Sequence, residues 1–261
     1  MSYTALAHMY ERLNADAPYE KWIAYLDAVI RHFMPQNPGL VLDLACGTGR
    51  ITRGLAALGY DMIGVDASED MLAQAWAEQT DPPILYLHQR MESFELYGTV
   101  GAVVCCLDSL NYLLKPGDLE TCFSLVHNYL DPNGVFLFDM NTPYQFETGY
   151  GNRDYFLESR GEKGLPQLYC GWRNQYDPKT GLCDFSLDLF EEEGKGLFRH
   201  TREVQTERCY AWEEIRDTLQ RTGFELLDVY RSLDRRKWHG EEDVPRWFVV
   251  ARCKKSQSEQ A

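Results

Sequence analysis

Residues 41–49 read Val-Leu-Asp-Leu-Ala-Cys-Gly-Thr-Gly, and this stretch decides the fold. An apolar run leads into a turn that contains Gly47 and Gly49, and helix-like spacing follows through Leu58. The glycines let the backbone turn sharply and approach a ligand with no side chain in the way. The stretch therefore predicts a strand, a tight turn and a helix, in that order.

The same alternation of short apolar runs and helix-like stretches continues along the chain. Strands are expected at residues 40–44, 62–66, 84–87, 102–107, 135–139, 224–230 and 246–253. Helices are expected at residues 18–33, 69–78, 118–129 and 212–222, besides the one that reaches Leu58. Such alternation implies right-handed crossovers. We therefore predict an α/β fold with a doubly wound, Rossmann-like sheet of seven mostly parallel strands.

A central segment interrupts that alternation. Turn signals at Asp177–Gly181 and Gly194–Gly196 separate runs in which aromatic and β-branched residues alternate. This pattern predicts an antiparallel β-meander inserted into the α/β domain. The expected organisation is a main domain (1–141 and 208–255) that begins with a helical N-terminal lid (1–38), an inserted substrate-capping subdomain (142–207) and a disordered tail (256–261).

The composition is that of a globular protein with an acidic surface. Lys and Arg number 26 against 40 Asp and Glu, so the formal net charge is −14. Such a surface repels phosphate backbones and no basic run interrupts it, so we do not expect a nucleic-acid partner. The eight cysteines form no C-x-x-C motif and the six histidines are dispersed, so no metal site is predicted. Without a leader or an apolar stretch that spans a bilayer, we expect a cytoplasmic protein with no membrane partner.

Two acidic residues at strand ends indicate the class of ligand. Asp66 stands 19 positions after Gly47, where a carboxylate can accept hydrogen bonds from both ribose hydroxyls of an adenosine. A dinucleotide would want a third glycine where Thr52 stands, and a pyrophosphate would sit poorly beside Asp43. S-adenosylmethionine has no phosphate and carries a sulfonium and an ammonium, so an acidic strand end suits it. Alternatively, both acids could cap the helices that follow them.

Three later segments fall at the same edge of the predicted sheet. Residues 90–92 follow the third strand, where a side chain can cover an adenine face or hold its amino group. Within them, Met91 is equally well explained as a core residue. Residues 107–112 and 138–143 follow the fourth and fifth strands, at the mouth where ligands bind outside the carboxyl ends.

Together these motifs resemble a known family, and the resemblance covers nearly all of the chain. The chain is similar to the class I S-adenosylmethionine-dependent methyltransferases, and within them to the bacterial YqeM-like methyltransferases, relatives of the sugar-amine N-methyltransferases. The segments that match family motifs are Asp43–Gly49, Gly64–Leu72, Asp108–Leu113, Phe138–Pro143 and, for the N-terminal lid, Ala17–Trp22. Relatives often carry an Asp-Met pair after the third strand, where this chain has Arg90-Met91. The resemblance implies the cofactor and the reaction class, and it leaves the acceptor open.

From these motifs and the resemblance, a set of cofactor-binding residues is expected. They are Tyr10, Tyr19, Trp22, Asp43, Ala45, Gly47, Gly49, Asp66, Ala67, Met71, Arg90, Met91, Glu92, Leu107, Asp108 and Asn111. Core packing explains Trp22 as well as a lid does, whereas Tyr10 and Tyr19 suit a lid better. Asn111 could do no more than close a turn.

The sequence indicates less clearly which residues contact the methyl acceptor. His200, Glu203 and Tyr210 lie where the insertion returns to the mouth, so one of them could act as a general base. The alternative for these residues is a solvated strand face. We expect N- or O-methylation of a small molecule beneath a roof formed by the insertion and the N-terminal segment, in a monomer or a dimer. A non-catalytic S-adenosylmethionine-binding regulatory or scaffolding protein is the alternative, and a nicotinamide-dependent oxidoreductase is disfavoured by Thr52 and Asp43.

Overall fold

The computed structural model describes residues 9, 12–13, 17–78, 80–159, 166–240 and 242–255. Its main sheet, here sheet A, has seven strands in the order β10-β11-β5-β4-β1-β2-β3. The strands are β1 (Leu40–Leu44), β2 (Asp61–Asp66), β3 (Leu85–His88), β4 (Val100–Cys105), β5 (Leu130–Asn141), β10 (Phe224–Tyr230) and β11 (Arg246–Cys253). Only the pairings of β11 with β5 and with β10 are antiparallel. The predicted seven-stranded, mostly parallel sheet is therefore confirmed.

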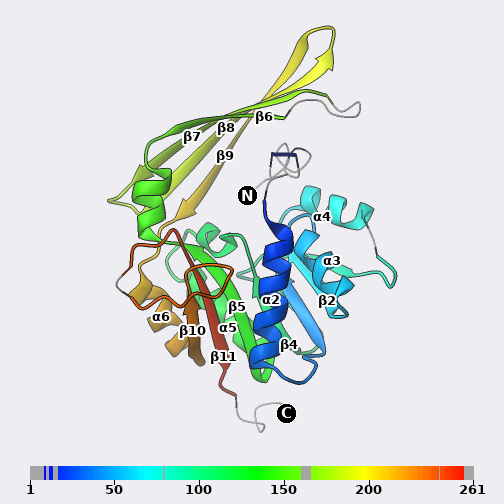
Figure 1. Ribbon diagram of the computed structural model, residues 1–261, viewed down its shortest axis with the longest axis vertical. Helices are drawn as coiled ribbons and strands as arrows, with labels where there is room; N and C mark the ends of the chain where they lie inside the picture. The colour runs from blue at the N-terminus through cyan, green and yellow to red at the C-terminus, as the bar shows by residue number, and fades with distance from the viewer. Residues whose placement is uncertain are drawn as a thin grey trace.

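Helices cover both faces of sheet A, because successive side chains along its strands point to opposite faces and both faces are apolar. In β1, Val41 faces one apolar cluster while Leu42 and Leu44 face the other. On the Val41 side lie α2 (Tyr19–Phe33), α3 (Arg50–Ala57) and α4 (Glu69–Ala77), and on the other side lie α5 (Asp118–Tyr129) and α6 (Trp212–Arg221). In Figure 1, α2 runs in front of sheet A beside α3.

The segment after β5 forms a second sheet, here sheet B, with the strand order β6-β7-β8-β9. Its strands are β6 (Asp154–Ser159), β7 (Leu168–Asp177), β8 (Leu182–Gly194) and β9 (Leu197–Arg208), and all its pairings are antiparallel. The predicted meander is thus confirmed. Figure 1 shows sheet B standing above sheet A, with the far ends of β8 and β9 projecting away. The proposed domain boundaries stay a prediction.

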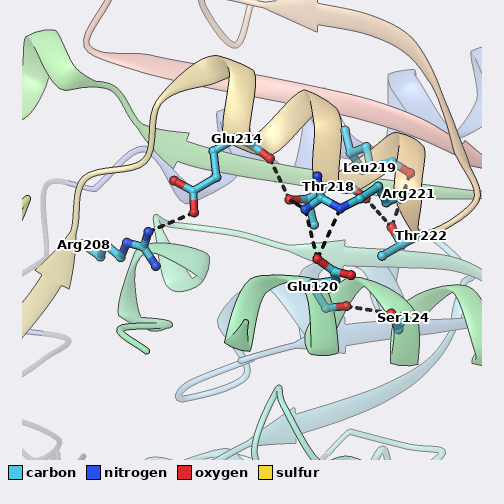
Figure 2. A network of polar contacts seen from close by, with 8 residues as sticks. All are labelled: Glu120, Ser124, Arg208, Glu214, Thr218, Leu219, Arg221 and Thr222. Atoms are coloured by element: carbon cyan, nitrogen blue, oxygen red, sulfur yellow. Dashed lines mark hydrogen bonds and ion pairs between the residues drawn. The ribbon is translucent and has the colours of Figure 1, made fainter. Parts of the chain in front are cut away.

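Polar contacts fix the point where sheet B returns to sheet A. Arg208, the last residue of β9, donates to the Glu214 carboxylate on α6 at 2.9 Å, and Arg221 on α6 donates to Glu120 on α5 at 2.9 Å (Figure 2).

Among the described residues, no helix combines the length and the apolar character needed to cross a bilayer.

Candidate cofactor and acceptor site

The turn between β1 and α3 is built around residues with positive φ. Ala45, Gly47 and Gly49 have φ angles of 63°, 56° and 75°. A Cβ on Gly47 would meet nothing within 4 Å, whereas one on Gly49 would lie 2.5 Å from the Tyr86 hydroxyl oxygen. Gly47 therefore leaves the backbone open to a ligand, while Gly49 makes room for a neighbouring side chain.

The Asp66 carboxylate holds this turn in place. Its two oxygens accept hydrogen bonds from the backbone N–H groups of Gly47 and Ser68, both at 2.8 Å. The cap of α4 is Ser68, whose hydroxyl accepts from the Met71 N–H at 3.3 Å. Asp66 therefore joins the ends of β1 and β2, and the capping role expected as its alternative belongs to Ser68.

Asp43 lies beneath the same turn and is only 2% exposed. It accepts a hydrogen bond of 2.6 Å from the hydroxyl of Thr52, the residue at the third glycine position of a dinucleotide motif. Burial raises the pKa of Asp43 to about 7 and also raises the pKa of Asp66. A buried acid beside a partly buried one makes this end of the site suited to a cationic ligand and poorly suited to a pyrophosphate.

One cavity of about 380 Å³ joins this turn to the inner face of sheet B. The residues predicted to bind the cofactor that line it are Tyr19, Asp43, Ala45, Gly47, Asp66, Ala67, Met71, Arg90, Met91, Glu92, Leu107 and Asp108. Met91 also packs against the core of sheet A, so both of its expected roles agree with its position. Arg90, which stands where relatives often carry an acid, forms an ion pair of 2.5 Å with Glu92.

Three other predicted cofactor residues do not line the cavity. Gly49 packs against Tyr86, and Trp22 is buried against Phe248 with ring centroids 5.2 Å apart. Asn111 is fully buried and ties chain segments together: it donates to the Arg208 carbonyl at 2.9 Å and accepts from the Asn141 N–H at 3.0 Å. The prediction for Tyr10 lies outside the described residues.

The three candidates for a general base are placed away from the cavity. His200 is exposed, pairs with Asp188 at 2.7 Å and stacks on Phe190. Tyr210 is fully buried and donates its hydroxyl proton to a backbone carbonyl, that of Leu113. Glu203 contacts Gln205, which itself lines the cavity. None of the three lines the cavity, so their expected role as a general base stays a prediction that their placement does not favour.

A buried charge cluster at the end of β4 was not predicted. Asp139 is fully buried and accepts from the N–H groups of Leu107 at 2.7 Å and Asp108 at 2.9 Å. Arg246, on the neighbouring β11, pairs with Asp139 and with Asp108, the latter at 2.8 Å. Leu107 and Asp108 both have positive φ, so this cluster holds the backbone in an uncommon conformation at the cavity mouth. Burial, partly offset by Arg246, raises the pKa of Asp139 to about 6.

Glu207 is a second residue that sequence reasoning missed. It is 3% exposed, lines the cavity and accepts a hydrogen bond of 3.2 Å from the Asn141 amide. The same amide donates to the Tyr150 hydroxyl oxygen at 2.9 Å. A signal was present in the sequence, because Glu203, Gln205 and Glu207 alternate and so share one face of β9.

The donor set fits S-adenosylmethionine. Carboxylates at Asp43 and Asp66 match its ammonium and its ribose hydroxyls, and the open side of Gly47 lets the ligand reach the backbone. Residues 90–92 also line the cavity, where the Glu92 carboxylate can accept from an adenine amino group and the Met91 or Arg90 side chain can cover the ring.

Known proteins share this architecture. Residues 41–134 match the family described as "Methyltransferase domain". The protein YqeM of Bacillus subtilis, which is named for methyltransferase activity, is 32% identical over 88% of this chain and 89% of its own length. A crystal structure of an S-adenosylmethionine-dependent methyltransferase from Clostridium acetobutylicum has a TM-score of 0.82 and 26% identity, and covers 97% of this chain and 99% of that one. The chain therefore belongs to the YqeM-like family of S-adenosylmethionine-dependent methyltransferases.

Proposed function

We propose that this enzyme methylates a nitrogen or oxygen atom of a small molecule held between the glycine turn and sheet B. The observation that carries the proposal is the continuity of the cavity, which extends from Asp66 to Glu207. A ligand at the glycine turn and an acceptor against sheet B would thus share one continuous cavity. When bound, S-adenosylmethionine supplies an activated methyl group on a sulfonium.

The chain's own residues then have positioning roles. Asp66 would hold the ribose hydroxyls, Asp43 and the backbone at Gly47 the amino-acid end, and residues 90–92 the adenine. Tyr19, at the start of α2, lines the cavity and would help to exclude water. Holding the two reactants in contact accounts for much of the rate in a displacement of this kind.

The acceptor would lie against an apolar wall. Trp172, Phe185 and Leu187, from β7 and β8, line the cavity on the inner face of sheet B. Proteins similar to part of this chain bear names with nitrogen or oxygen acceptors. They include a dTDP-amino-sugar N,N-dimethyltransferase of Streptomyces fradiae, a glycine/sarcosine N-methyltransferase and a ubiquinone biosynthesis O-methyltransferase. Their acceptors support a small molecule and leave both atoms open.

Calorimetric titration with S-adenosylmethionine and with S-adenosylhomocysteine tests the cofactor site. We expect both to bind, and Asp66→Ala to weaken both by tenfold or more, because the mutation removes the ribose contact and loosens the turn. The matched control is Asp61→Ala, which removes an exposed carboxylate from the other end of β2. Unchanged affinity in Asp66→Ala, or no binding by the wild type, would contradict the proposed site.

A further inference from the structure

The acceptor end of the cavity holds more negative than positive charge. Three carboxylates, those of Asp108, Asp139 and Glu207, meet one guanidinium, that of Arg246. Arg246 already pairs with Asp108 and Asp139. If all four are ionised, the cluster has an excess of two negative charges in a setting largely shielded from water.

Glu207 carries the part of this excess that faces the cavity. Within the part of the chain that the structure describes, no ion pair joins Glu207 to a cationic side chain. Its hydrogen-bond donor is the neutral amide of Asn141, and after burial the neighbouring carboxyl of Asp108 does most to raise its pKa. A residue that only tied sheet B to sheet A would be better served by a neutral glutamine, because a buried carboxylate beside another one is destabilising.

The surroundings of this acid indicate the shape of its ligand. Gln205 and Glu207 form a polar row along β9, and Phe185, the cross-strand partner of Gln205, lines the cavity beside them. Trp172 and Leu187 extend the same apolar wall. An acceptor that fits would have an apolar body along the wall and a cationic group at the row, whereas a carboxylate would be repelled.

We propose, resting on the methyltransferase function above, that Asp108 and Glu207 form the acceptor subsite for a primary or secondary amine on an apolar body, and that Glu207 takes the proton of the incoming ammonium. The N–H bond breaks and an O–H bond forms on the Glu207 carboxylate, which leaves a neutral amine and a carboxylic acid. The nitrogen lone pair so freed then takes the methyl carbon, and the electron pair of the former carbon–sulfur bond stays on sulfur. The methylated product carries the positive charge until it loses a second proton to water.

The electrostatics agree with that role. Burial, and then Asp108, raise the pKa of Glu207 well above its ordinary value, which brings it closer to that of an amine and eases proton transfer. The other titratable groups that face Glu207 are Arg246 on β11, Tyr150 after β5, and Cys183, its cross-strand partner on β8. The hydrogen bond from Asn141 and the charge of Arg246 oppose this rise in the pKa of Glu207.

Binding to the full-length protein saturated with S-adenosylhomocysteine tests the proposal without turnover. The probes are aryl-alkyl primary amines of 9 to 14 heavy atoms, 2-phenylethylamine among them, each beside the alcohol and the carboxylate of the same skeleton. We expect amines to bind at least tenfold more tightly than their matched alcohols and carboxylates in ligand-observed NMR titrations. Amine binding should weaken as the pH falls from 8.5 to 6, since protonation of Glu207 removes the attracting charge.

Two variants assign the effect to one residue. Glu207→Gln should weaken amine binding tenfold or more and flatten its pH profile, with the affinity for S-adenosylhomocysteine unchanged within twofold. Glu203→Gln, the same change on the same face of β9 but outside the cavity, should alter neither. Equal binding of alcohols or carboxylates, amine binding that survives in Glu207→Gln, or no amine bound at 10 mM would each overturn the amine subsite. Failure of S-adenosylhomocysteine itself to bind would instead overturn the proposed function.

Discussion

Replacing Asp43 with asparagine should stabilise the protein at alkaline pH. Burial raises the pKa of Asp43 from 3.8 to about 7, so between these values the folded protein keeps a proton that the unfolded chain has lost. The free energy of unfolding therefore falls as the pH rises through this window, by about 1.4 kcal/mol per pH unit. Asparagine does not ionise, and its amide oxygen can still accept from the Thr52 hydroxyl, so the variant avoids this loss.

The size of the effect follows from the width of the window. Between pH 5.5 and pH 8.5, only the part below the folded-state pKa, about 1.5 pH units, lies inside this window. Over that range the free energy of unfolding of the wild type should fall by about 2 kcal/mol, whereas that of Asp43→Asn should not show this fall. Urea unfolding followed by tryptophan fluorescence at the two pH values measures this difference. The control Asp61→Asn, exposed at the start of β2, should stay within about 0.5 kcal/mol of the wild type at both. If Asp43→Asn and the wild type lose the same free energy between these pH values, the burial argument is wrong.

Three further changes probe other parts of the site. Arg246→Met should lower the free energy of unfolding by about 3–5 kcal/mol in urea, because it leaves two carboxylates unpaired; a loss below about 1 kcal/mol would contradict the charge cluster. Gly49→Ala should lower it by about 1–3 kcal/mol through its positive φ and the contact with the Tyr86 hydroxyl, and Tyr86→Phe in the same chain should recover part of the loss. Trp172→Ala should raise the half-saturating concentration of an accepted substrate by about tenfold, while Tyr176→Ala, on the same strand but outside the cavity, should not; equal effects would argue against an aromatic acceptor wall.

Most of the fold was predictable because its signals are local. Every residue of β4 is buried, and the last two strands of sheet A have the bounds that the sequence predicts. The errors lie at strand ends, where a distant residue decides. We expected β4 to continue to Leu107, but it ends at Cys105 because Asp139 holds the backbone of Leu107 in a positive-φ conformation. Similarly, β5 begins at Leu130 because this residue pairs with Val100, ahead of the expected turn.

The sequence also predicted one end of the site better than the other. The cofactor end is built from segments that each follow one strand, so motif and position together pointed to Asp43, Gly47 and Asp66. The acceptor end brings Glu207 from sheet B and Arg246 from the last strand of sheet A to one place. No local pattern links such residues, and only the alternation along β9 pointed to the side chains that face inward.

The buried acids are difficult to explain by stability alone. Removal of the negative charge at Asp43 is expected to stabilise the fold, and Glu207 lies beside another carboxylate without a cationic partner among the described side chains. Arg246 is the cation that this cluster holds among the residues that the structure describes, and its two ion pairs fix the strained backbone at the cavity mouth. Groups that weaken a fold are retained where a ligand offsets their cost. On this reasoning both ends of the cavity are shaped for positive charge, one end for the cofactor and the other for an amine.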